Sequence, residues 1–324
     1  ELRTENRHIN LGLVGDISII CKFQKECKYV NGLIVNSIYT ENSNLAKEIN
    51  DESIVFMKNY DDLLEVVDAV YIVSHPQKHY EQIKRALSIG KHVLCEAPVA
   101  LKMVEKLELQ ELAHKRNCIL MDSIKTAYST AYARLLLLIK AGKIGKVVSV
   151  DATATSLNET SMVDVNNAWN SVTAWGPTVL LPVYQILGTD YKKKEIISRL
   201  IDENSSYDTF TKIDFIYDAA VATIKVGKGV KSEGELIVSG TKGYAYVPAP
   251  WWKTDYFEIR YENPAENKRY FYQLDGEGIR YELVAFLKAI ETGKSAGYID
   301  EEVSNSIVKI IEAFYSREDF VGLK

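Results

Sequence analysis

The stretch Gly90-Lys91-His92-Val93-Leu94-Cys95-Glu96-Ala97-Pro98-Val99-Ala100 decides the fold of this 324-residue chain. Its middle, His92–Glu96, is a short apolar run that predicts a buried strand. Residues 77–89 carry apolar side chains at helical spacing and stop at Gly90, and Met103–Arg116 repeats that helical pattern. A strand between two helices is the repeating unit of parallel sheets. The stretch therefore predicts a doubly wound α/β sheet.

The same alternation extends over the first part of the chain. Further strands are expected at Ile9–Gly15, residues 32–39, Ala69–Val73 and residues 118–121, with helical segments at residues 44–49 and 61–65. After residue 121 strand patterns dominate, at residues 146–155, 195–201, 212–217, 220–226, 235–246, 256–261 and 269–274. Gaps such as residues 241–243 suit hairpins of an antiparallel sheet. Helices are expected at residues 130–141, at Ile279–Thr292 and after an N-cap at Asp300.

This change, from alternating strands and helices to mostly strands, predicts two domains. Residues 1–124 form a Rossmann-like, dinucleotide-binding-type domain, and residues 125–324 form an α+β domain with a large, mostly antiparallel sheet. No internal repeat or low-complexity linker separates them. Because the chain begins at Glu1, an excised domain of a larger protein is a further interpretation.

The composition limits the kinds of partner that the chain is expected to bind. The net charge of −5 argues against nucleic-acid binding, and the basic run of residues 192–194 is expected to be a solvated turn. No apolar run approaches the roughly 20 residues that span a bilayer. The 4 cysteines lack metal-ligand spacing, so buried thiols in a reducing cytoplasm are expected and no metal site is.

Four ordered motifs resemble the Gfo/Idh/MocA family of NAD(P)-dependent oxidoreductases. They are Asp68-Ala69-Val70-Tyr71-Ile72-Val73-Ser74-His75-Pro76-Gln77-Lys78-His79, residues 90–98, Leu138-Ile139-Lys140-Ala141-Gly142-Lys143-Ile144-Gly145-Lys146-Val147 and Gly240-Thr241-Lys242-Gly243. The resemblance implies an NAD or NADP cofactor and a sugar, polyol or related small-molecule ligand. It also implies a homo-oligomer that packs through the sheets of the second domain.

The resemblance also assigns cofactor-binding residues. They are Gly15, Ser74, His75, His79 and Glu96. Glu96 ends a strand at the edge where doubly wound sheets bind ligands, although a structural carboxylate is an equal alternative. His79 has either a role in the cleft or a hydrogen bond at the start of a helix. His75 lies in a turn beside the expected path of the cofactor.

Three motifs depart from the family pattern. The glycine-rich loop should read Gly-x-Gly-x-x-Gly from Gly15, but the chain has Gly15-Asp16-Ile17-Ser18-Ile19-Ile20, which puts a carboxylate beside the expected phosphates. Ala97 replaces the family's catalytic lysine. In the family's Gly-x-His-x-x-Asp motif, Thr178 replaces the histidine and Leu181 the aspartate, and no histidine follows His114.

Two classes of function remain open. One is a divergent oxidoreductase in which Lys125 or Tyr128 donates the proton. The other is a catalytically silent binding or assembly domain, since residues 247–253 resemble modules behind a nucleotidyltransferase-like domain. Four tryptophans could line a sugar cleft, although aromatic residues more often pack in the core or an interface: Trp169, Trp175, Trp251 and Trp252.

Overall fold

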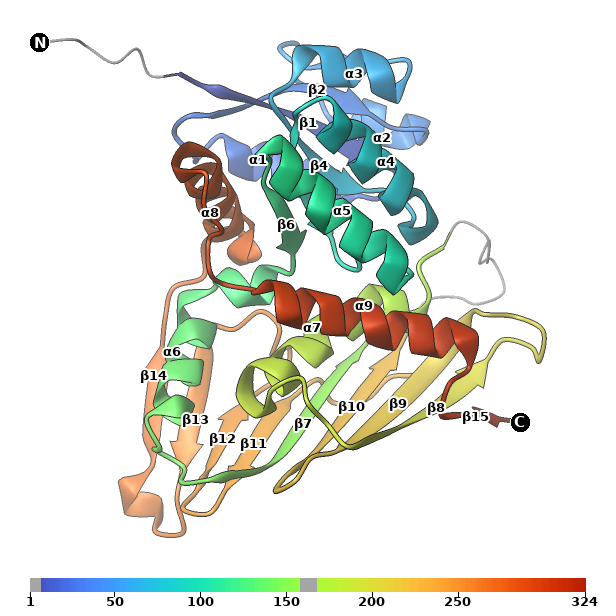
Figure 1. Cartoon of the computed structure of the whole chain (residues 1–324). Helices are drawn as coiled ribbons and strands as arrows, with labels where there is room; N and C mark the ends of the chain where they lie inside the picture. The colour runs from blue at the N-terminus through green and yellow to red at the C-terminus, as the bar shows by residue number, and fades with distance from the viewer. Residues whose placement is uncertain (1–6, 158–167) are drawn as a thin grey trace, which may run out of the picture. The chain divides into compact units, whose positions relative to one another are not determined.

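The computed structural model describes residues 7–157 and 168–324 (Figure 1). Two compact units emerge, one of Glu1–Lys125 with Asp275–Tyr298 and the other of Thr126–Leu274 with Ile299–Lys324. The chain crosses from the first unit to the second beside the predicted boundary at residue 124. The segment Asp275–Tyr298, which we expected in the second domain, instead packs with the first.

The first unit is built on a parallel sheet of six strands in the order β3-β2-β1-β4-β5-β6. This is the strand order of dinucleotide-binding folds, with the chain reversing direction between β1 and β4. All five residues of β4 are buried, as expected for a strand covered by helices on both faces. The strands are β1 (Ile9–Gly15), β2 (Leu33–Tyr39), β3 (Val55–Phe56), β4 (Ala69–Val73), β5 (His92–Glu96) and β6 (Leu120–Ser123).

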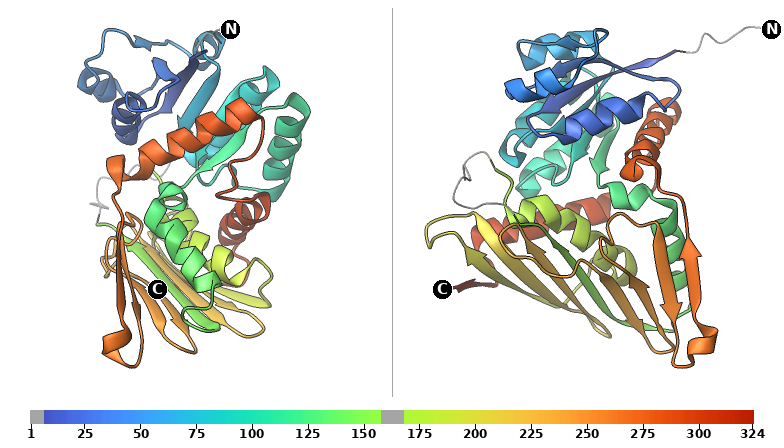
Figure 2. Two further views of the ribbon diagram at one scale, coloured as in Figure 1. Left: turned by 90° about the vertical axis from the view of Figure 1, so that its left-hand side faces the viewer. Right: turned by 180° about the vertical axis from the view of Figure 1, so that it is seen from behind.

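Six α-helices surround this sheet in the described part of the unit, and Figures 1 and 2 show them on both faces. Helix α4 packs beside α5, and α1 packs beside α8, the helix that the chain contributes from its distant segment. Ser18 precedes α1 without a side-chain cap. The helices are α1 (Ile19–Cys27), α2 (Ser43–Glu48), α3 (Tyr60–Val66), α4 (Pro76–Ser88), α5 (Met103–Arg116) and α8 (Ile279–Thr292).

The second unit is a nine-stranded mixed sheet in the order β14-β13-β12-β11-β7-β10-β9-β8-β15. Only the pairs β7–β10 and β8–β15 are parallel, so the predicted, mostly antiparallel sheet is confirmed. Its strands are β7 (Val147–Thr155), β8 (Lys193–Leu200), β9 (Asp208–Ile216), β10 (Val221–Gly227), β11 (Leu236–Gly240), β12 (Tyr244–Val247), β13 (Tyr256–Arg260), β14 (Lys268–Phe271) and β15 (Phe320–Leu323).

Helices cover one face of this sheet. They are α6 (Thr130–Lys140), α7 (Ser171–Leu187) and α9 (Glu301–Ser316). Asp300 caps α9 as predicted, with its side chain accepting from the Val303 amide at 2.8 Å. The view from behind in Figure 2 shows no helix of the described second unit on the other face. None of the described helices is long and apolar enough to cross a membrane.

The predicted hairpin gap at residues 241–243 is confirmed, since it joins β11 to antiparallel β12 within residues 235–246. Another prediction for the second unit needs correction. The basic run is not a solvated turn at Lys194, which lies within β8 with a side chain only 6% exposed. Its ammonium is 2.7 Å from Glu318 and 3.0 Å from Asp319, and these carboxylates compensate its burial.

Gly15 lies close to the backbone of the neighbouring strand β4 in the first sheet. Its φ of +146° suits glycine, and a Cβ built there would lie 2.7 Å from the Val73 carbonyl carbon. We expect Gly15→Ala to destabilise the protein by about 3 kcal/mol or more in urea unfolding, because strain and a backbone clash add. The control Gly90→Ala has a φ of +80° but meets nothing within 4 Å. It should cost only about 1–2 kcal/mol. Equal losses for the two variants would contradict the clash.

Candidate functional site

The candidate site is the carboxyl edge of the six-stranded sheet, meaning the residues at the ends of β1, β2, β4, β5 and β6 and just beyond. Ligands of doubly wound sheets bind at such an edge, near the point where the strand order reverses. The structure brings four of the predicted residues there, since Gly15 ends β1, Ser74 and His75 follow β4, and Glu96 ends β5.

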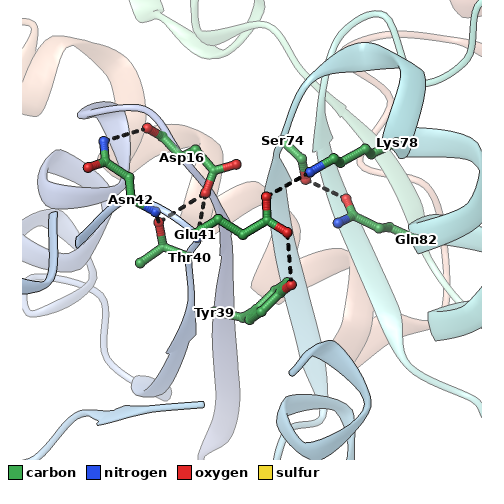
Figure 3. Close-up of polar contacts among 8 residues, drawn as sticks. All are labelled: Asp16, Tyr39, Thr40, Glu41, Asn42, Ser74, Lys78 and Gln82. Carbon is green, nitrogen blue, oxygen red and sulfur yellow. Dashed lines mark hydrogen bonds and ion pairs between the residues drawn. The ribbon is translucent and has the colours of Figure 1, made fainter. Parts of the chain in front are cut away.

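Asp16 is tied to the neighbouring strand rather than left in the loop. One carboxylate oxygen accepts from the Glu41 amide at 2.7 Å and from the Thr40 hydroxyl at 3.1 Å (Figure 3). The Asp16 carbonyl accepts from the Asn42 side-chain amide at 3.1 Å. These three bonds join the end of β1 to the turn after β2. The acidic side chain is therefore fixed at the reversal point of the sheet.

A second connection reaches from α4 to the same turn. The Lys78 ammonium is 3.0 Å from the Glu41 carboxylate, which also accepts from the Tyr39 hydroxyl at 3.3 Å (Figure 3). The hydrogen bond from Lys78 holds the pKa of the Glu41 carboxyl below its ordinary value. Both side chains are substantially exposed, so the ion pair contributes little to stability. The ion pair does engage Glu41, the first acidic residue in the sequence after β2.

Ser74 and His75 position the start of α4. The Ser74 hydroxyl donates to the side chain of Gln82, which lies in the middle of α4 (Figure 3). His75 is the N-cap, and its Nδ1 accepts from the Gln77 amide at 3.2 Å. A histidine cap in this role needs an unprotonated Nδ1. The two residues thus lie at the edge, with these atoms engaged in holding the helix.

His79 is fully buried and joins two loops of the carboxyl edge. Its Nδ1 lies 2.7 Å from the Pro98 carbonyl oxygen, and its Nε2 lies 2.7 Å from the Ser74 carbonyl oxygen. Burial lowers the pKa of His79 to about 4, although the two carbonyls oppose that effect. A neutral imidazole has one N–H, so the ring donates to one of these carbonyls and lies against the other, between the segments after β4 and after β5. This placement favours the hydrogen-bonding alternative over direct contact with a cofactor.

Glu96 is the centre of a polar cluster at the ends of β4, β5 and β6. Its Oε2 accepts from the Tyr71 hydroxyl at 2.9 Å and from the Ser123 hydroxyl at 3.0 Å. Burial raises the pKa of Glu96, while Lys125 and the two donors oppose the rise. The Lys125 ammonium lies 3.8 Å from Glu277, and its side chain is 22% exposed. Ala97, which follows Glu96, is almost completely buried.

The remaining candidates lie in the second unit. Tyr128 is buried in the short 3₁₀ turn Lys125–Tyr128. Thr178 is half-buried on α7, whereas Leu181 on the same helix is fully buried. Trp251 is a core residue, because it is 0% exposed and donates to the Thr153 carbonyl at 3.0 Å. The rings of Trp175 and Trp252 contact each other, with centroids 4.8 Å apart.

Several residues at or near this edge were not predicted from the sequence. Gln82, Ser123 and Glu282 have no local motif, and their roles come from contacts between distant segments. One signal was available for Glu282, since it is a carboxylate among the inward-facing apolar residues of Ile279–Thr292. Among the described residues, no group of three or more His, Cys, Asp or Glu side chains is arranged to hold a metal ion.

Comparison with known proteins identifies this architecture. Residues 14–123 match a family model described as an oxidoreductase family with an NAD-binding Rossmann fold. This match and the structures of similar fold support the Gfo/Idh/MocA oxidoreductase family, which the sequence motifs resemble. The fold of the chain is that of KijD10, a 3-ketoreductase from Actinomadura kijaniata solved with NADP and TDP-benzene. The TM-score is 0.85 at 17% identity, over 98% of this chain and 100% of that one.

Curated relatives are reductases and dehydrogenases. The chain is 37% identical over 101 residues to the dTDP-3,4-didehydro-2,6-dideoxy-alpha-D-glucose 3-reductase of Streptomyces violaceoruber, covering 31% of this chain and 30% of that protein. It is 26% identical over 260 residues to the trans-1,2-dihydrobenzene-1,2-diol dehydrogenase of Bos taurus, covering 76% of each. The matches to the first curated relatives span only 27% to 32% of their length.

His79 gives a prediction about pH. Since its folded pKa of about 4 lies below the ordinary value of 6.5, the unfolded chain binds the extra proton first. The contribution is present above pH 6.5 and is lost as the pH falls toward 4, by up to roughly 3 kcal/mol. We expect His79→Gln to flatten this part of the stability profile in urea unfolding. His114→Gln on α5 is the control, and a wild-type slope retained in His79→Gln would contradict the assignment.

Proposed function

We propose that this chain has lost the lysine-assisted hydride transfer of its family and serves as a binding or assembly domain for a sugar-like small molecule. The observation that carries the proposal is the fixed Asp16 carboxylate at the reversal point of the sheet. A dinucleotide brings its pyrophosphate to the backbone of this loop. A carboxylate held there by two donors repels that charge.

The side chains around the edge support the same proposal. Ile17 is 39% exposed in the loop where the family pattern has a second glycine, so a branched side chain stands where backbone must be approached. Ala97 offers neither a charge nor a proton donor at the position of the family's lysine. Thr178 and Leu181 replace the expected acid–base dyad in the second unit. The residues present do not suit an NAD or NADP cofactor in the family's pose.

A divergent oxidoreductase is the second candidate, and Lys125 favours it. The Lys125 side chain is partly exposed, and its charge opposes the rise in the pKa of Glu96 that burial causes. A lysine at this edge is chemically able to donate a proton to a carbonyl oxygen. Tyr128 is the less suitable donor because it is buried. A relative solved with NADP keeps this candidate open.

The partners follow from the fold and the charge. A homo-oligomer through the open face of the second unit's sheet remains our proposal, as does a cytoplasmic location for a chain whose cysteines are all free. An attached nucleotidyltransferase-like domain would suit the assembly role. No nucleic acid or membrane partner is proposed, given the net charge of −5.

Titration with NADH and NADPH tests the cofactor proposal. We expect the folded wild-type protein to show no saturable change in nucleotide fluorescence or heat with either compound. Asp16→Asn keeps an oxygen acceptor for Glu41 and Thr40 but removes the charge, so it should gain measurable affinity. Asp61→Asn, on the exposed Arg85 ion pair, is the control and should gain none. Saturable binding by the wild type would overturn the proposal in favour of the oxidoreductase.

Light scattering of the purified protein tests the assembly proposal. On the open face, Lys212 pairs with Asp214 at 2.7 Å, and Thr223 donates to Asp214 at 2.7 Å. We expect a homo-oligomer that Thr223→Arg dissociates, because a long cationic side chain would have to be desolvated in the interface and would compete with Lys212 for Asp214. Lys140→Ala, at the exposed end of α6, is the control. A wild-type mass of 36.6 kDa, that of one chain, would contradict this assembly.

A further inference from the structure

The amino edge of the six-stranded sheet, where its strands begin, contains a cavity of about 810 Å³. This edge is opposite to the candidate site, because parallel strands begin on one side of a sheet and end on the other. The cavity is lined by the segments that lead into β1, β2, β4 and β5 and by the end of α8, all within the first unit. Its volume is in the range of sites that bind small molecules.

Hydrogen bonds join the segments that line the cavity. Asp68, which precedes β4, donates its amide to the Asn10 carbonyl at 2.9 Å, and its carboxylate accepts from the Asn10 amide at 2.9 Å. The Asp68 carbonyl accepts from the His92 amide at 3.2 Å. On the other side of β1, the Ile9 amide donates to the Gly32 carbonyl at 2.8 Å. The starts of the four strands are therefore held side by side, with neighbours about 4.8 Å apart.

Side chains of both charges line this cavity without pairing with each other. Arg7 and Lys91 are cationic, whereas Asp68 and Glu291 are anionic. Across residues 7–157 and 168–324, none of the four forms an ion pair with another side chain. Opposite charges that share a cavity but do not meet are suited to a ligand that lies between them and pairs with both.

A smaller hollow beside the cavity provides a comparison. It has a volume of about 360 Å³ and shares His8, Asn31 and Gly32 with the cavity, so the two adjoin. The charged side chains that line it pair with each other, since the Lys28 ammonium lies 3.0 Å from the Asp51 carboxylate. The charges of the larger cavity have no such compensation from the described residues.

His92 adds an uncharged donor to the lining, next to Lys91. Its Nδ1 accepts from the Ile119 amide at 3.0 Å, so the hydrogen of the neutral ring lies on Nε2. Burial lowers the pKa of His92, although Asp68 opposes this effect, and the neutral form is favoured. No described residue accepts a hydrogen bond from Nε2. Lys91 and His92 together suit a carboxylate, which accepts from both.

Glu291 and Asp68 suit a cationic group. Glu291 lies in the last turn of α8, where the negative end of the helix dipole also favours a cation. Asp68 uses Oδ2 to accept from the Asn10 amide, and its other oxygen is able to accept from a ligand. A metal ion is not indicated, because the described residues contain no group of three or more His, Cys, Asp or Glu arranged to hold one. An ammonium group has the charge and the donors that these carboxylates need.

We propose that this cavity binds a small zwitterion, namely a free α-amino acid or a short peptide with unblocked ends. The carboxylate of the ligand pairs with Lys91 and accepts from His92. Its ammonium group pairs with Asp68 and Glu291. A ligand of one charge compensates only one side of the cavity, whereas a zwitterion compensates both. The site lies at the opposite edge from the expected dinucleotide, so it stands whether or not the proposed loss of hydride transfer holds.

Calorimetric titration of the full chain with each common α-amino acid, and with the dipeptide alanylalanine, tests for such a site. We expect saturable heat from at least one of these compounds. Its N-acetyl and C-terminal amide derivatives each lack one charge, and each should bind at least about fivefold more weakly. A folded wild type that binds none of the compounds would overturn the proposal, as would a derivative that binds as tightly as its parent.

Two substitutions locate the site. Asp68→Asn keeps an oxygen for the Asn10 amide and Lys91→Gln keeps a polar side chain, but each removes one charge. Each should weaken binding at least about fivefold, while urea unfolding checks that the variant is folded. Asp190→Asn and Lys140→Gln, at exposed positions of the second unit, are the matched controls and should leave binding unchanged. Binding that is indifferent to Asp68→Asn and Lys91→Gln would contradict the proposal.

Discussion

The hydrogen bonds that Asp16 accepts from Thr40 and the Glu41 amide are the constraint on which our proposal for the first unit depends. They tie the end of β1 to the turn after β2 and fix a carboxylate there. Gly15 still provides the close backbone approach of a dinucleotide loop, since a Cβ there would clash with Val73. The loop thus keeps the geometry needed to form the sheet while presenting a carboxylate that repels phosphate. On our proposal, the same few residues retain the fold without the family's mode of cofactor binding.

Elsewhere at the carboxyl edge, burial disfavours the charged forms of titratable side chains. It lowers the pKa of His79, which lies between the segments after β4 and β5, and raises the pKa of Glu282. The same physical effect therefore disfavours a positive charge at one position and a negative charge at the other. The Lys78–Glu41 pair at this edge is, by contrast, substantially exposed.

The sequence was sufficient for elements with strong local patterns and insufficient for contacts between distant segments. The apolar strands β1, β4 and β5 and helix α5 fall where their periodicity placed them. Helix α8 was located correctly, but periodicity reveals only that one face is buried and not which unit covers it. Lys194 was missed for the same reason, because Glu318 and Asp319 reach it from the far end of the chain. The roles of Ser123 and Glu282 likewise need the tertiary fold.

A crystal structure of the protein grown with a saturating concentration of NADP⁺ is the most direct measurement. We predict that no dinucleotide lies over Gly15 and that Asp16 still accepts from Thr40 and the Glu41 amide. A pyrophosphate bound to the backbone amides of Ile17 and Ser18, with Asp16 turned away, would show that the carboxylate does not exclude the cofactor.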